Sequence, residues 1–259
     1  MDLDTPLWVR PLAERPAAAR RLLFFPHAGG AASYFRPLGG TLPPAIEPLA
    51  IQYPGRQDRR REPPVSSIDE LAEALFAVLG DSPAHTPTVF FGHSMGAVVA
   101  FEVIRRYERA GRPGPLGLIA SGRRAPVIRR PELLHTRTDA EVVREMRRLN
   151  GTESDFLDDP DVRAMILPAI RADYRVIETY EFDGGPPVNV PVHAFVGTAD
   201  PRVTVDEAAA WQRHTAGEFR LHTFPGGHFY LTEVPAAGLA DEIASSMRSF
   251  AEPARTGPG

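Results

Sequence analysis

Short apolar runs alternate with longer amphipathic runs along most of the chain. Short apolar runs bounded by Gly or Pro are typical of buried strands, and apolar residues spaced three and four apart are typical of helices. An alternation of the two predicts an α/β fold with a mostly parallel central sheet and helices on both faces. The predicted strands are Arg21–Phe25, Ile46–Tyr53, Val89–Phe91, Leu116–Ala120, Val190–Val196 and Phe219–Phe224, and the predicted helices are Ile68–Leu79, Ala97–Arg109, Val205–His214 and Ala236–Phe250.

One segment interrupts this alternation. From about Pro131 to Phe182 no run reads as a strand, whereas Asp139–Leu149 and Asp161–Tyr180 both have a helical, amphipathic pattern. A helical insertion between two strands is the usual form of a lid, so we expect a lid at the carboxyl edge of the sheet, where ligands bind. The alternative is that these helices only cover the sheet.

The composition fits one globular domain. The chain has 259 residues, of which 43% are hydrophobic and 24% charged. These values suit a single domain over residues 1–259, with the lid at about 131–182. The tail Pro253–Gly259 is rich in Gly and Pro, and we expect it to be disordered. No apolar run is long enough to span a membrane, and Met1–Arg15 lacks the apolar core of a secretory signal.

Cysteine and lysine are both absent, so all 29 basic residues are arginine. The sequence therefore excludes disulfides, thiolate metal sites, a cysteine nucleophile and a lysine Schiff base, and it fits a reducing cytoplasm. The formal net charge of -4 gives no reason to expect binding to nucleic acid. We expect a cytoplasmic protein with neither a nucleic-acid nor a membrane partner.

Ser94 is the candidate nucleophile. It lies in Gly92-His93-Ser94-Met95-Gly96, directly after the apolar run Thr88–Phe91 and before the helical run Ala97–Arg109. A Gly-x-Ser-x-Gly sequence between a strand and a helix is typical of a nucleophile elbow, in which the glycines leave room for a strained turn. The alternative is an ordinary turn rich in Gly and Ser.

A serine hydroxyl needs a base to accept its proton and an acid to orient that base. In this type of fold the acid and then the histidine follow the serine. His228 lies in a glycine loop just beyond the last predicted strand, from which it can reach back over the carboxyl edge, and we expect it to be the base. Among the other histidines, His214 ends a predicted helix, where the dipole favours a cation. His193 and His222 lie inside strand patterns, and His135 lies at the entry to the insertion.

Asp200 is the candidate acid. It follows the strand Val190–Val196 in a Gly-Thr-Ala-Asp-Pro turn. Asp183, in a loop before a glycine, is a weaker candidate, and Asp206 and Glu207 fit the first turn of a helix. The expected role of Asp200 is to fix the tautomer of the histidine and to stabilise its imidazolium form.

The tetrahedral intermediate of such a reaction needs amide donors. We expect one to be the backbone N–H of Met95, directly after the nucleophile. The second is expected from the loop after the first predicted strand, Pro26–Gly30, with Ala28 as the first choice and His27 as the second. Packing within the loop is the alternative role for His27.

Taken together, these motifs resemble those of type II thioesterases, the stand-alone editing enzymes of modular polyketide and nonribosomal peptide synthases. The resemblance runs from about Arg21 to Phe250. It implies an α/β-hydrolase fold and hydrolysis of short or prematurely decarboxylated acyl groups on the phosphopantetheine arm of a carrier domain. The segments occur in the family's order: Phe25-Pro26-His27-Ala28-Gly29-Gly30, Gln52-Tyr53-Pro54-Gly55-Arg56, Gly92-His93-Ser94-Met95-Gly96, Gly197-Thr198-Ala199-Asp200 and Gly226-Gly227-His228-Phe229, with Asn150-Gly151-Thr152 and Arg171-Ala172-Asp173-Tyr174 in the lid.

The resemblance also implies partners and cofactors. The partners are acyl carrier domains of a modular synthase, the substrates include small acyl thioesters, and no metal or other cofactor is needed. Carrier domains are usually acidic, so two arginine clusters are candidate docking surfaces, with solubility as their alternative role. One cluster is Arg56, Arg59, Arg60 and Arg61 in an expected solvated loop, and the other is Arg123, Arg124, Arg129 and Arg130.

Three other functions fit the same residues. A general carboxylesterase or lipase would use the same triad, as would an acyltransferase or cyclising thioesterase. We expect water to be the acyl acceptor, because neither end of the chain carries an obvious linker to an upstream carrier. A binding module that keeps the fold without activity is the third, and it would fail to react at Ser94 with a fluorophosphonate.

Overall fold

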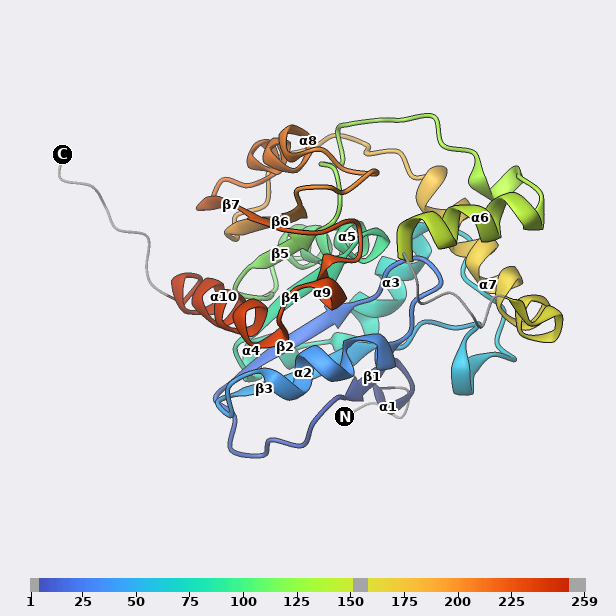
Figure 1. Ribbon diagram of the computed structural model, residues 1–259. Coiled ribbons are helices and arrows are strands. Elements are labelled where there is room, and N and C mark those ends of the chain that lie inside the picture. Colours follow the sequence, from blue (N-terminus) through green and yellow to red (C-terminus); the bar gives the residue numbers. More distant parts are fainter. Residues whose placement is uncertain (1–4, 151–157, 252–259) are drawn as a thin grey trace.

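The computed structural model describes residues 5–150 and 158–251, and within these residues seven strands form one sheet (Figure 1). The strand order is β1-β3-β2-β4-β5-β6-β7, in which β1 pairs antiparallel with β3 and all other neighbours pair parallel. The predicted α/β fold with a mostly parallel sheet is confirmed. The strands are β1 (Val9–Pro11), β2 (Arg20–Phe25), β3 (Ile46–Ile51), β4 (Thr88–His93), β5 (Leu118–Ser121), β6 (Val192–Gly197) and β7 (Phe219–Phe224).

Side-chain caps begin several of the helices. The Ser67 hydroxyl accepts a hydrogen bond from the backbone N–H of Glu70 at the start of α3, and Thr204 and Glu207 form a capping box at the start of α8. Such caps satisfy amide groups that have no partner within the helix. The helices are α1 (Thr5–Trp8), α2 (Arg36–Thr41), α3 (Ile68–Leu79), α4 (Ser82–His85), α5 (Met95–Arg109), α6 (Asp139–Asn150), α7 (Pro160–Glu178), α8 (Val205–Ala209), α9 (Tyr230–Glu233) and α10 (Ala236–Ser249), with short 3-10 helices at Ala32–Phe35, Gln57–Arg59, Leu134–Thr136 and Ala210–His214.

Both faces of the sheet are buried. Leu23 and Phe25 of β2 belong to an apolar core that also contains residues of α3 and α5, whereas Leu22 and Phe24 belong to a second core with residues of α2 and α10. Successive strand residues point to opposite faces, so helices on both faces require apolar residues at nearly every strand position. This explains why the strands appear in the sequence as continuous apolar runs.

The helices α6 and α7 lie between β5 and β6 in the chain, and Figure 1 shows them together beside the sheet, on the side away from α10. They share a small apolar cluster of their own, formed by Val142, Val143, Leu167 and Ile170. Their bounds agree closely with the two helices predicted for the insertion. Among the described residues no helix is both long and apolar enough to cross a membrane. Gly151, Thr152 and the tail Pro253–Gly259 lie outside the described residues.

Several short elements were not predicted, among them β1 and α2. β1 is an edge strand of three residues, which is too short for any periodic pattern to show. α2 has the sequence Arg-Pro-Leu-Gly-Gly-Thr, and its two glycines give it a low helix propensity. It forms nevertheless because Leu38 is buried in the core that α2 shares with α10.

The expectation of a cationic His214 at a helix end was wrong. The residue ends a 3-10 helix, and its ring is buried against Phe101 and Trp211. Burial, together with the positive charge of Arg105, lowers the pKa of His214 to about 4. Desolvation of the ring therefore outweighs the helix dipole.

Candidate active site

Ser94 occupies a sharp turn between β4 and α5. Its backbone has φ 54° and ψ -116°, a conformation that residues other than glycine rarely adopt. A Cβ atom at Gly96 would lie 2.0 Å from the carbonyl oxygen of Phe25, and one at Gly92 would lie 2.4 Å from the Cα of Ala97. Only glycine fits at these two positions, so the turn has the backbone geometry and the steric requirements of a nucleophile elbow.

His228 and Asp200 lie in line with this serine. The His228 Nε2 atom is 3.1 Å from the Ser94 Oγ atom, and the His228 Nδ1 atom is 2.9 Å from an Asp200 oxygen. A carboxylate can only accept, so Nδ1 carries the proton and Nε2 is free to accept the hydroxyl proton. The other Asp200 oxygen accepts hydrogen bonds from the backbone N–H groups of Arg202 and Val203. These bonds hold the carboxylate in the position from which it orients the histidine.

The remaining candidates have other partners. His135 donates to Glu178 at 2.6 Å, and the ring nitrogen of His193 lies 2.9 Å from the Ser246 hydroxyl. Asp183 forms an ion pair with Arg105. His222 pairs with Glu242, and Glu207 belongs to the capping box of α8. The structure therefore brings Asp200 and His228 together with Ser94 and gives these other groups structural contacts.

Two backbone N–H groups are the expected donors of an oxyanion hole. Ala28 lies in the loop after β2, and Met95 is the first residue of α5. Within residues 5–150 and 158–251, neither N–H has a hydrogen-bond partner in the protein. Ala28 and Ser94 line the same cavity, which has a volume of about 20 Å³. Among the described residues both expected donors are therefore left without a protein acceptor, and Ala28 lies in a loop that lines this cavity together with Ser94.

His27 packs within the site. Its ring contacts the rings of Tyr34, His93 and Phe229. Burial lowers the pKa of His27 to about 3, with smaller contributions from the neighbouring His228 and Arg56. A neutral, packed ring at this position corresponds to the alternative role of packing within the loop.

A larger cavity adjoins the small one, with which it shares lining residues. Its volume is about 420 Å³, and it lies between the loop after β2 and the helices α6 and α7. Both cavities are lined by His27, Ala28, Leu149, Tyr174 and Phe229. Leu149 of α6 and Tyr174 of α7 line both, so the insertion contributes to the walls of the two cavities.

Several arginines of the two predicted docking clusters are buried, which corrects the expectation of a solvated loop. Arg56 pairs with Asp173, Arg59 with Glu62, and Arg124 with Glu132. These three buried arginine side chains form ion pairs and are not available on the surface. The exposed members of the two clusters are Arg60, Arg61, Arg129 and Arg130.

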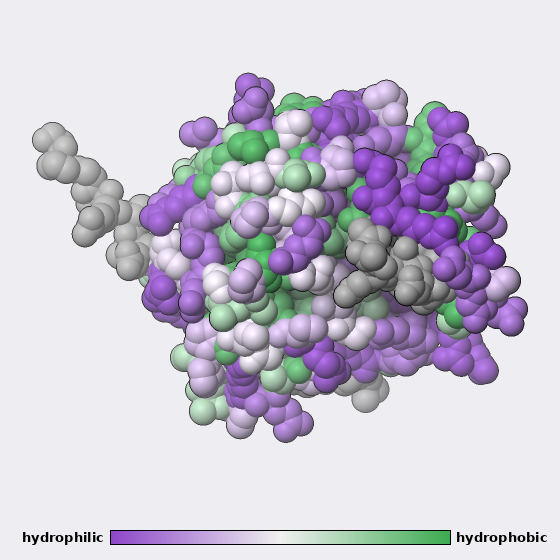
Figure 2. All heavy atoms as spheres, viewed as in Figure 1, coloured by the Kyte–Doolittle hydropathy of each residue, from purple (hydrophilic) through white to green (hydrophobic). Residues whose placement is uncertain are grey.

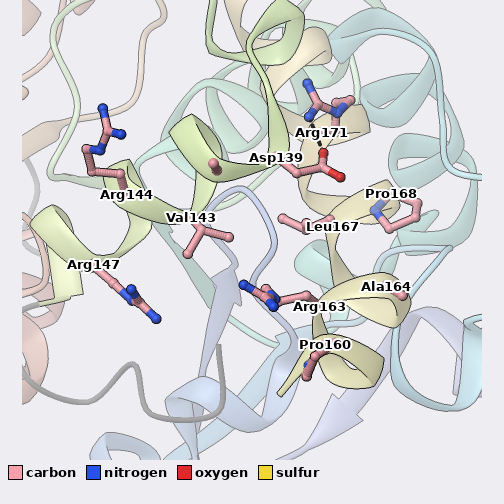
Figure 3. Close-up of a pocket in the computed structure, with 11 residues that line it drawn as sticks. Asp139, Val143, Arg144, Arg147, Pro160, Arg163, Ala164, Leu167, Pro168 and Arg171 are labelled. Atoms are coloured by element: carbon pink, nitrogen blue, oxygen red, sulfur yellow. Dashed lines mark hydrogen bonds and ion pairs between the residues drawn. The ribbon is translucent and has the colours of Figure 1, made fainter. Parts of the chain in front are cut away.

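A different basic surface lies on the outer side of α6 and α7 (Figure 3). Figure 2 shows strongly hydrophilic residues gathered over these helices. Between them is a groove of about 820 Å³ whose lining shares no residue with the two cavities near Ser94. The arginines that line the groove are Arg144, Arg147, Arg163 and Arg171.

No group of three or more His, Asp or Glu side chains among the described residues could hold a metal ion.

The sheet topology and the elbow at Ser94 define an α/β-hydrolase fold. Residues 20–250 match the family model described as "Thioesterase domain", so the chain belongs to the thioesterase family, whose members hydrolyse thioesters. This confirms the family resemblance inferred from the motifs.

Similar proteins agree with this assignment. The chain is 44% identical over 233 residues to the thioesterase PikA5 of Streptomyces venezuelae, and the alignment covers 90% of this chain and 83% of PikA5. Among solved structures it is similar to the type II thioesterase BorB from the borrelidin biosynthetic cluster, with 45% identity, a TM-score of 0.84 and coverage of 93% and 98%. It is also similar to the thioesterase RedJ from the prodiginine pathway of Streptomyces coelicolor, with 35% identity, a TM-score of 0.84 and coverage of 91% and 94%.

Proposed function

We propose that this thioesterase removes aberrant or stalled acyl groups from the phosphopantetheine arm of acyl carrier domains during polyketide or nonribosomal peptide synthesis. The observation that carries the proposal is the alignment of Ser94, His228 and Asp200 in a chain 45% identical to a type II thioesterase. Ser94 is the nucleophile, His228 the general base and Asp200 the orienting acid. Met95 and Ala28 supply the oxyanion hole.

In the first half of the reaction, His228 accepts the proton of the Ser94 hydroxyl while the oxygen attacks the thioester carbonyl carbon. The negative charge moves to the carbonyl oxygen, where the N–H groups of Met95 and Ala28 stabilise it. When this intermediate collapses, the C–S bond breaks and the thiol leaves with the proton from His228. The products are an acyl ester on Ser94 and a free pantetheine thiol on the partner.

In the second half, His228 accepts a proton from water, and the resulting hydroxide attacks the ester carbonyl. The C–O bond to Ser94 breaks and the serine recovers its proton, which releases a carboxylic acid. Asp200 stabilises the imidazolium form in both halves. Every step uses groups of the chain or of the substrate, so the proposed reaction requires no metal or other cofactor.

The cavities support a substrate attached to a partner. The small cavity beside Ser94 suits the reacting carbonyl group, and the larger cavity between the β2 loop and the insertion suits an extended arm. We propose that α6 and α7 act as a lid over this space. The carrier domain would then lie at the rim of the larger cavity, outside the lid.

The test compares three substrates with wild type and Ser94→Ala. The substrates are an acyl group on a carrier domain, the same acyl group on free pantetheine, and the matching oxygen ester. We expect wild type to show its highest kcat/KM with the carrier and its lowest with the oxygen ester, and Ser94→Ala to retain the wild-type Tm without turnover. Preference for the oxygen ester would favour a general esterase, and turnover by Ser94→Ala would refute the assignment of the nucleophile.

A further inference from the structure

Asp173 of α7 joins the insertion to the loop that carries Ala28. Asp173 is buried, with 3% of the residue exposed, and one of its carboxylate oxygens accepts a hydrogen bond of 2.7 Å from the backbone N–H of Gly29. The same oxygen accepts a hydrogen bond from the guanidinium of Arg56, which is also buried. One carboxylate therefore connects three segments that lie far apart in the sequence.

The bond to Gly29 fixes the peptide group on one side of Ala28. The peptide group on the other side is fixed as well, because the carbonyl oxygen of His27 accepts a 2.9 Å hydrogen bond from the N–H of Gly30. In a trans peptide the N–H points away from the carbonyl, so this second bond sets the direction of the Ala28 N–H. With both flanking peptides held, Ala28 has no free backbone rotation left with which to turn its N–H.

The loop has no room to adopt this position without glycine at residue 29. Gly29 has φ +76°, and a Cβ atom there would lie 2.6 Å from Ile170 of α7. Helix α7 therefore packs closely against the loop at Gly29, the same residue whose N–H donates to Asp173 of α7. A displacement of α7 would remove both the carboxylate and the packing at once.

The segment after β3 holds the loop from its other side. The Gln52 side chain accepts a 2.9 Å hydrogen bond from the backbone N–H of Ala32 and donates one to the carbonyl oxygen of Arg56. The Tyr53 hydroxyl donates to the carbonyl oxygen of Pro26 at 3.3 Å. Gln52, Tyr53 and Arg56 are all buried, so this segment supports the loop at both of its ends.

We infer that Asp173 is a positioning residue, which holds the Ala28 amide in the oxyanion hole through Gly29 and makes that hole depend on the position of α7. The inference rests on the proposed function, because it assumes that Ala28 stabilises the oxyanion. Asp173 does not touch the reacting atoms, and it acts only on an interaction made in the transition state. Its loss lowers kcat and leaves KM nearly unchanged.

The test separates the hydrogen-bond acceptor from the buried charge. In an Arg56→Met background, neither Asp173→Asn nor Asp173→Leu leaves a buried cation unpaired. The Asn variant keeps an acceptor for the Gly29 N–H, and the Leu variant does not. We expect the Leu double variant to have a kcat roughly 10- to 100-fold below that of the Asn double variant, a part of the loss that follows deletion of an oxyanion donor.

The second readout is inhibition by an acyl trifluoromethyl ketone, which forms a charged tetrahedral adduct with a serine. Its inhibition constant should rise by the same factor as kcat falls, whereas a purely structural role would change Tm alone. Equal kcat values for the two double variants, or a loss confined to KM, would overturn the inference. If the double variants do not fold, Asp173→Glu keeps the charge next to Arg56 but moves the acceptor by the length of one methylene group. Its kcat should fall and the inhibition constant should rise by the same factor, and a change in Tm without a change in either would overturn the inference.

Asp139→Asn is the matched control. Asp139 pairs with Arg171 between the same two helices but on their exposed side (Figure 3). It should retain the wild-type kcat, and a loss equal to that of the Asp173 variants would assign the effect to general loosening of the insertion. All variants are assayed with an S-acyl N-acetylcysteamine thioester, which requires no carrier domain. If wild type hydrolysed this small substrate but not carrier-bound acyl groups, the proposed partner would be wrong, and the comparison of the Asp173 variants would still be valid.

Discussion

Gly96→Ala tests whether the turn at Ser94 and the loop after β2, which carries Ala28, are packed rigidly against each other. Gly96 is the second residue of α5, and a Cβ atom there would lie 2.0 Å from the carbonyl oxygen of Phe25 and 2.7 Å from that of Pro26. Both obstacles are backbone atoms at the end of β2, which pairs with β3 on one side and β4 on the other. Neither carbonyl can rotate away as the tip of a side chain would.

The magnitude follows from the distance. Real Cβ atoms keep at least 3.0 Å from such neighbours, so α5 and the end of β2 must separate by about 1 Å. Overpacking of this kind costs roughly 1–3 kcal/mol, and each kcal/mol lowers Tm by roughly 2–4 °C in a domain of this size. Ala28, the proposed oxyanion donor, lies three residues after Phe25, so the shift would also separate its N–H from Ser94. Misplacement by about 1 Å can lower kcat roughly 100-fold.

The assay measures Tm by calorimetry and kcat on a small acyl thioester. Gly238→Ala is the control, since Gly238 lies in α10 and a Cβ atom there would meet nothing within 4 Å. The control should gain roughly 0.5–1 kcal/mol, because alanine favours a helix, and it should keep the wild-type kcat. If Gly96→Ala kept both the wild-type Tm and a kcat within about two-fold of wild type, the steric account of the elbow would be wrong.

Three further predictions concern other parts of the molecule. Asp200→Asn should lower kcat roughly 10⁴-fold with little change in Tm, because an amide can stabilise the wrong tautomer of His228; a loss below ten-fold in steady-state assays would contradict the role of Asp200. Burial lowers the pKa of His27 and of His193 to about 3, so the unfolded chain binds more protons between pH 6.5 and 3 and stability falls as the pH drops through this window. Each histidine contributes about 1.4 kcal/mol of unfolding free energy per pH unit. Denaturant titrations at several pH values should show that the unfolding free energy of His193→Gln falls less steeply with decreasing pH than that of wild type, and an equal slope would refute the lowered pKa of His193. Amides of α6 and α7 should exchange hydrogen faster than those of β4, and slower exchange would argue against a lid.

The sequence predicts best what depends on local pattern. The run Thr88–Phe91 and the helix after it place Ser94 at an elbow because burial on both faces makes a parallel strand apolar throughout. Asp200 and His228 could be found by position alone, since each lies just beyond a predicted strand. The edge strand β1 could not be found, because three residues carry no period, and its formation depends on pairing with β3.

The buried arginines mark the limit of this kind of reasoning. A run of charges such as Arg56–Arg61 normally faces solvent, and nothing within the run distinguishes Arg56 from Arg60. What buries Arg56 is Asp173, which lies 117 residues away. The prediction of a cationic His214 was wrong for the same reason, because the desolvation that lowers its pKa comes from aromatic rings that only the fold brings together. Long-range partners decide the state of a charged group, and the local sequence does not contain them.

The order of strands in the sheet determines how the loop of His228 must run to reach Ser94. Ser94 follows β4, Asp200 follows β6 and His228 follows β7, so the loop of His228 must cross the ends of β6 and β5 to reach the serine. At the end of β6, a Cβ atom on Gly197 would lie 2.3 Å from the carbonyl oxygen of Gly227. After β5, Gly122 has φ +57°, and a Cβ atom there would lie 2.7 Å from the ring of His93 and 3.6 Å from that of His228. Glycine at the end of β6 therefore lets the loop of His228 lie close to the sheet, because a side chain there would push the backbone of Gly227 away. Glycine after β5 leaves room for the ring of His93, which packs against that of His228.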